Sequence, residues 1–141
     1  MSSRPKSPES RTIRSFFMKR LAQLRAAIPS AKLAAIASED GLLSATDSDA
    51  EPSPLDRRGA VLASLVAVAR TGARELQLAD TVCVLVQCLD GVLIVRPFGT
   101  TRRRLLLLQL TDQAEASRAL AAANRLALDI EGRLAPTGPA C

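Results

Sequence analysis

The sequence predicts an α/β domain of the α+β type, in which a single antiparallel five-stranded sheet is covered by helices on both faces. Three apolar runs joined by short turns fill residues 81–110, and such nearly continuous Val, Leu and Ile content is typical of strands buried on both sides. A second, shorter hairpin is indicated by Asp-Gly at residues 40–41. Three segments with helical spacing surround these strands, so the predicted order is α-β-β-α-β-β-β-α.

Composition limits the functions that the chain can perform. Its 141 residues suffice for one domain, and 48% are hydrophobic but only 2% aromatic, which disfavours a base-stacking surface for single-stranded nucleic acid. The chain has no histidine, so His-dependent catalysis and His metal sites are excluded. We therefore expect a binding domain that has no metal and no cofactor.

The basic charge is concentrated at the N-terminus. Seven of the 19 basic residues lie in the first 25 positions, together with a single acidic residue. We predict a disordered basic tail over residues 1–11, a folded domain over 12–134 and a flexible tail over 135–141. No secretory signal and no apolar run of about 20 residues is present, which indicates a cytoplasmic protein without a membrane span.

The first helix is predicted to start at Ser10 or Thr12 and to end near Ile28, before Pro29. Its apolar stripe would face the sheet, and Arg14, Lys19 and Arg25 would form a solvated basic back. A second hypothesis is that this basic amphipathic helix binds an acidic membrane surface or a partner.

The hairpin and the second helix follow. Strands are predicted over 32–38 and 42–47, and a helix over about 55–78. A wide apolar arc of the helix is expected to face the core, formed by Val61, Leu62, Leu65, Val66, Val68, Ala69 and Leu76. The opposite side is small and weakly polar, with Ala60, Ala63, Ser64, Ala67 and Thr71. Small residues permit close helix packing, so a second copy of the chain is the simplest candidate to cover them.

The three-strand segment holds two of the three cysteines. Cys83 and Cys88 are five residues apart, so a regular strand places them on opposite faces, where they neither pair nor share a metal. We expect both to be buried, in a reducing compartment. A third helix is predicted to end near Leu134, with Asp112 and Glu115 resembling a capping box at its start.

Catalytic motifs are absent. The glycines do not have the spacing of a phosphate-binding loop, and no serine lies in a nucleophile elbow, so we expect no enzyme activity. The most suggestive cluster is Arg102, Arg103 and Arg104, at the start of the fifth strand. These residues could protect the strand end from aggregation, or could contact an acidic partner or phosphate. An arginine finger for a GTPase is a further hypothesis.

The element order and two segments resemble the roadblock family, the dynein light chain roadblock type with many bacterial members. The segments are AIASEDGLL at 35–43 and DGVLIVRPFG at 90–99. The resemblance covers about residues 24–134 and implies a roadblock- or profilin-like fold. It also implies a homodimer formed by pairing the third strand and second helix of each copy. Together with the small-residue face, it places Ala60, Ala63, Ser64, Ala67, Thr71, Val82 and Val84 at the interface.

The resemblance further implies function. The family has no catalytic residues of its own, and its bacterial members scaffold or regulate Ras-like small GTPases encoded nearby. Two alternatives remain open: a domain that senses a small molecule, and a nucleic-acid or membrane-surface binder that acts through the basic N-terminus.

Overall fold

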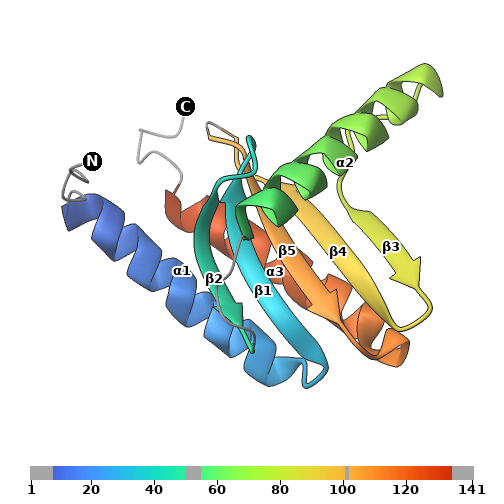
Figure 1. The fold of residues 1–141 in the computed structure, drawn as a ribbon. Helices are drawn as coiled ribbons and strands as arrows, with labels where there is room; N and C mark the ends of the chain where they lie inside the picture. Colours follow the sequence, from blue (N-terminus) through green and yellow to red (C-terminus); the bar gives the residue numbers. More distant parts are fainter. Residues whose placement is uncertain (1–7, 50–54, 101, 135–141) are drawn as a thin grey trace.

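The computed structural model describes residues 8–49, 55–100 and 102–134. The elements run in the order α1 (Pro8–Ala27), β1 (Ala31–Ser38), β2 (Leu43–Ser48), α2 (Leu55–Glu75), β3 (Val84–Cys88), β4 (Gly91–Phe98), β5 (Arg104–Leu110), a short 3-10 helix (Gln113–Glu115) and α3 (Ala116–Leu134) (Figure 1). The predicted order is confirmed.

The N-terminal boundary differs from the prediction. Helix α1 begins at Pro8, so residues 8–11 are helical and do not belong to a disordered tail. Proline suits the first position of a helix because its fixed φ matches the helix and its missing N–H has no partner there. The rest of the predicted tails, residues 1–7 and 135–141, lies outside the described residues.

The five strands form one antiparallel sheet in the order β2-β1-β5-β4-β3. The long strands β1 and β5 pair from Ala31↔Leu110 to Ser38↔Arg104 and occupy its centre with β4. Strands β2 and β3 form the two edges, so β3 pairs with β4 alone within the chain.

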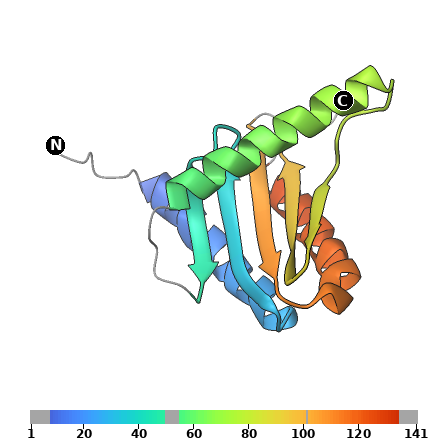
Figure 2. The same ribbon diagram turned by 45° about the vertical axis from the view of Figure 1, so that its right-hand side comes forward.

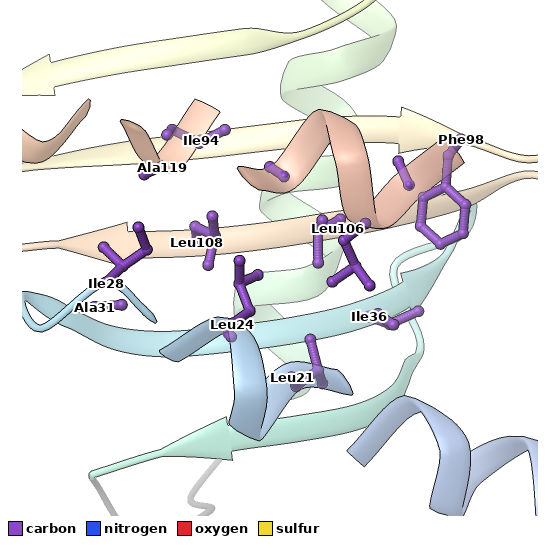
Figure 3. Close-up of a cluster of buried hydrophobic side chains, with 14 of the residues drawn as sticks. Leu21, Leu24, Ile28, Ala31, Ile36, Ile94, Phe98, Leu106, Leu108 and Ala119 are labelled. Atoms are coloured by element: carbon purple, nitrogen blue, oxygen red, sulfur yellow. The ribbon is translucent and has the colours of Figure 1, made fainter. Parts of the chain in front are cut away.

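Helices α1 and α3 cover one face of the sheet, and α2 crosses the other face (Figure 2). The larger core lies on the first face, where Leu21 and Leu24 of α1 and Ala119 of α3 surround Leu106 and Leu108 of β5 (Figure 3). On the α2 face, Leu62 and Val66 pack on alternate residues of β1, β4 and β5. The continuous apolar runs are therefore explained by a sheet with packed side chains on both faces.

The basic residues of α1 do not all face solvent as predicted. The Arg25 guanidinium donates from Nε to the Ala31 carbonyl at 3.0 Å and from Nη1 to Asp47 at 2.8 Å, and it also pairs with Asp49. Arg20 pairs with Asp129 of α3. The prediction of a solvated back was wrong for Arg25, because its long side chain reaches carboxylates at the first hairpin.

The two Asp-Gly turns rely on glycine for different reasons. Gly41 has a φ of 91°, as a tight hairpin requires, and its backbone lies against Gly59 and Ala60 of α2. Gly91, in the second Asp-Gly turn, does not have a positive φ. A Cβ at Gly91 would instead lie 2.4 Å from the Leu110 carbonyl oxygen, so close strand packing requires glycine at this position.

Candidate interaction surface

Helix α2 contacts the sheet through a narrower stripe than its sequence predicts. Leu62 and Val66, one turn apart, are buried, and Leu65 and Ala69 are half-buried. The outer parts of the predicted arc are instead exposed: Val61 at 65%, Val68 at 69% and Leu76 at 74%. The prediction was wrong for Val61 and Val68 because a straight helix touches the sheet along one line only, and for Leu76 because it lies beyond the end of α2 at Glu75.

The opposite side of α2 is exposed, as its small side chains suggested. Ala60, Ser64, Ala67 and Thr71 are open to solvent, and Ala63 is half-buried against the sheet. The Ser64 hydroxyl donates to the Ala60 carbonyl at 3.0 Å, and the Thr71 hydroxyl donates to the Ala67 carbonyl at 3.1 Å. Because both hydroxyls already have acceptors inside the helix, this face presents mainly methyl groups. Covering it would cost little in lost hydrogen bonds to water.

Strand β3 continues the apolar exposure at the edge of the sheet. It begins at Val84, so the predicted strand start at Thr81 is three residues early, and Val82 lies in the segment before the strand. Val82 is 60% exposed and Leu85 is 44% exposed, whereas Val84 is partly buried against the α2-side core. An edge strand with exposed apolar side chains is a template for pairing with another strand.

The cysteines differ from the prediction. Cys88 is exposed, because it ends an edge strand that no helix covers. Cys83 is half-buried beside the core under α1 and α3, and this burial raises the pKa of its thiol. Cys141 lies outside the described residues.

A groove of 690 Å³ opens beside the first half of α2, where the helix leaves the sheet uncovered. Its floor is apolar, with Leu33, Leu93 and Leu107 from three strands, and Val61 and Leu62 of α2 form one wall. Lys32, Arg57 and Arg58 add three cations to its lining, and Asp90 adds one carboxylate. This groove was not predicted from the sequence, in which the adjacent pair Arg57-Arg58 at the start of α2 was the available signal.

An ionic network links the C-terminal half of α2 to the turns beside it. The Arg70 guanidinium lies 3.3 Å from Glu39 Oε1, in the β1–β2 turn, and 3.5 Å from Asp80 Oδ1. Arg103 donates to Asp80 Oδ2 at 2.9 Å. The hydrogen bond from Arg103 holds the pKa of Asp80 below its usual range. This network fixes the segment that leads from α2 into β3.

The structure separates the three consecutive arginines. Arg103 joins the network on the α2 side of the sheet. Arg104 has the same parity as Leu106 and points to the other side, where its guanidinium lies 5.4 Å from the ring centroid of Phe17 in α1. Arg102 lines the same hollow as Arg104. These residues therefore do not form one patch, because successive side chains of a strand face opposite ways.

The described residues offer a surface for association. Among them, no group of three or more His, Cys, Asp or Glu side chains could hold a metal ion. Nor does any helix in the described ranges have the length and apolar content to cross a membrane. The chemistry of the α2 side is apolar contact, backbone pairing at β3, and cations beside the groove.

Comparison with protein families identifies one match. A family model described as "Roadblock/LC7 domain" matches residues 18–102 of the chain. No curated protein matches the sequence.

Solved structures show the same fold at low sequence identity. A Roadblock/LC7 domain from Streptomyces avermitilis superposes with a TM-score of 0.75 at 19% identity, over 84% of this chain and 98% of that one. A structure described as MglB with a tetrameric arrangement superposes with a TM-score of 0.73 at 21% identity, over 91% of this chain and 90% of that one. Profilin II of Acanthamoeba castellanii superposes with a TM-score of 0.61 at 19% identity, over 82% of this chain and 97% of that one.

Proposed function

The chain belongs to the Roadblock/LC7 domain family, and on that basis we propose that it is a non-enzymatic module that forms a homodimer and acts with a Ras-like small GTPase. The proposal takes the module to work in the cytoplasm. The observation that carries it is the exposure of small and apolar side chains on the outer side of α2, together with exposed apolar side chains at and just before the edge strand β3.

The proposed dimer joins two copies of this surface about a two-fold axis. Ala60, Ala63, Ser64, Ala67 and Thr71 let the two α2 helices approach closely, since none of these side chains is larger than threonine. The hydroxyls of Ser64 and Thr71 already donate to carbonyls of the same helix, so burial in the interface would not leave them without an acceptor. Burial of Val61 and Val68 would supply the apolar area that a specific interface requires, of about 1,600 Å² or more in total.

Pairing of β3 with its own copy completes the proposed interface. The side chains of Val82 and Leu85 would be buried, and the backbone groups at the outer edge of β3 would form hydrogen bonds with the second copy. The two sheets would then form one continuous sheet of ten strands, five from each copy.

The proposed GTPase contact uses the groove beside α2. Its floor of leucines offers apolar contact, and Lys32, Arg57 and Arg58 favour a partner surface rich in carboxylates. Another hollow on the same side is lined by Arg70, Arg74 and Arg103 together with the carboxylates of Glu39 and Asp80, so it keeps an excess of one positive charge. We assign the partner contact to these side chains and not to Arg102 and Arg104, which lie on the opposite side of the sheet. A single GTPase that touches both copies would give one partner per dimer.

Titration calorimetry with the small GTPase encoded beside this chain tests the function. We expect saturable binding with one GTPase per two chains, and no binding of GTP to this chain alone. Reversing the charge of Arg57 and Arg58 to Glu should weaken binding about tenfold or more, through lost attraction and new repulsion. The matched control is Arg125→Glu, an exposed residue of α3 on the far side of the sheet.

Two outcomes would contradict the proposal. One is the absence of heat with the neighbouring GTPase at tens of micromolar protein. The other is equal weakening of binding by the groove variant and by Arg125→Glu. That result would show that the overall charge of the protein, and not a contact in the groove, determines the affinity.

A further inference from the structure

A second hollow, the basic notch, lies on the opposite side of the sheet from α2. It is formed by Ile13, Arg14 and Phe17 of α1, Leu43 and Ser44 of β2, and Arg102 and Arg104, and its volume is 330 Å³. That volume lies at the small end of the range for ligand pockets, about 300–1,000 Å³. Three distant parts of the sequence therefore bring three arginines and a hydroxyl together.

The charge of the basic notch is not neutralised within the described chain. None of the described residues lining the notch is acidic, and neither Arg14, Arg102 nor Arg104 forms an ion pair with a described residue. Other arginines do contact carboxylates, among them Arg20, Arg25, Arg70, Arg103 and Arg118. The notch therefore holds three arginines that have no carboxylate partner among the described residues, whereas these other arginines form ion pairs.

Arg104 is held in this position at an electrostatic cost. Its guanidinium stacks toward the buried ring of Phe17, and burial, followed by the nearby charge of Arg102, lowers the pKa of the Arg104 side chain. The aromatic contact offsets part of this cost, because a ring face attracts a cation. A bound anion would offset the repulsion between Arg102 and Arg104 directly.

We propose that the basic notch is a binding site for the phosphoryl group of a small phosphate monoester. Guanidinium groups present paired N–H donors that match phosphate oxygens, and a phosphoryl dianion matches several cations better than a single carboxylate does. The Ser44 hydroxyl can donate a further hydrogen bond, and the half-buried side chains of Ile13 and Leu43 can contact the organic part of the ester. Leu43, on an edge strand, lines both the notch and the groove beside α2, but the arginines of the notch are not part of that groove, so this inference does not rest on the proposed GTPase partner.

Ligand binding here should stabilise the fold, because the notch joins α1, β2 and the start of β5. The melting temperature should rise with added inorganic phosphate, and with phosphoserine as a monoester, when sodium chloride keeps the ionic strength constant. We expect a rise of several degrees for each at saturation, with phosphoserine binding at least as tightly as inorganic phosphate.

The arginines supply a matched pair of variants. Arg102→Gln should weaken phosphate binding about tenfold or more, as measured by titration calorimetry, whereas Arg103→Gln should leave it unchanged, because Arg103 faces the other side of the sheet. Arg14→Gln provides a second variant that leaves the contact between Arg104 and Phe17 in place.

Three results would overturn the proposal. The first is the absence of saturable binding of either probe by the unmodified chain at millimolar concentration. The second is equal weakening in Arg102→Gln and Arg103→Gln, which would indicate a nonspecific charge effect. The third is binding of inorganic phosphate without phosphoserine, which would show that the notch does not admit an ester.

Discussion

Gln77 has the left-handed backbone conformation that ends α2. Its φ is 59°, its N–H donates to the Arg74 carbonyl at 3.0 Å, and the Leu78 N–H donates to the Ala73 carbonyl at 2.8 Å. These two bonds form the common C-terminal helix cap that favours glycine at the residue with positive φ. A side chain in this conformation is strained, because its Cβ approaches the backbone.

The strain predicts that Gln77→Gly stabilises the protein. We expect a gain of about 0.5–1 kcal/mol in the free energy of unfolding by urea, since glycine adopts this conformation without a steric cost. The matched control is Gln23→Gly, at an exposed position inside α1, which should lose a similar amount. Loss of stability in both variants would contradict the cap.

The two described cysteines should react at different rates. Cys88 is exposed, whereas Cys83 is half-buried and its thiol pKa is raised, which leaves less thiolate. In a Cys141→Ser background we expect Cys88 to label with a maleimide at least tenfold faster than Cys83, as read by peptide mass spectrometry. Faster labelling of Cys83 would contradict its packing against the core.

The ion pair of Asp80 with Arg103 makes stability depend on pH. Since the hydrogen bond from Arg103 lowers the pKa of Asp80 in the folded state, its contribution is present above the unfolded-state pKa of about 4 and is lost as the pH falls through the lower folded value. The unmodified protein should therefore lose more stability between pH 6 and pH 3 than Asp80→Asn does. Urea unfolding at the two pH values measures this difference, and equal losses would show that the pair contributes nothing.

At the scale of the elements, Arg25 connects α1 to the first hairpin. It contacts the Ala31 carbonyl, Asp47 and Asp49, and it is largely shielded from water. Arg25→Ala removes these contacts and leaves two carboxylates unpaired, so we expect a loss of about 1–3 kcal/mol in the free energy of unfolding. Lys19→Ala, at an exposed position of the same helix, should change stability by no more than about 0.5 kcal/mol. Equal effects would contradict a specific role for Arg25.

The elements themselves could be predicted from sequence because each has a local signal. The apolar runs in residues 81–110 predicted three strands, and helical spacing of apolar residues predicted three helices. Turn residues between these segments marked where the elements end. The Asp112 cap of the 3-10 helix before α3 also follows from its residue type, since its side chain accepts from the Ala114 N–H at 2.9 Å. Its expected partner Glu115 accepts instead from the Ser30 N–H at 2.8 Å.

The remaining features depend on where elements meet, which local patterns do not encode. The exposure of Cys88 follows from the position of β3 at one edge of the sheet, and the narrow α2 contact follows from the way in which the helix crosses the sheet. Arg25 and Arg20 form ion pairs because the fold brings distant carboxylates within reach. The groove and the basic notch arise in the same way, from residues of several elements.

At the scale of the whole molecule, the two sides of the sheet have different roles in this account. The α1 and α3 side holds the larger core and the basic notch. The α2 side presents exposed apolar residues, the groove and an unpaired strand edge. The proposed GTPase contact therefore depends on association through the α2 side.

Sedimentation equilibrium of the unmodified chain and of Ala67→Arg tests this claim most directly. An arginine on the outer side of α2 would place an unpaired charge in the close helix contact, so its dimer should weaken by about tenfold or more. The matched control, Ala121→Arg, makes the same change on the exposed side of α3 and should leave association unchanged. We expect a dimer at tens of micromolar for the unmodified chain and the control, and a largely monomeric Ala67→Arg variant. A monomeric unmodified chain at that concentration, or a dimer that Ala67→Arg leaves intact, would contradict it.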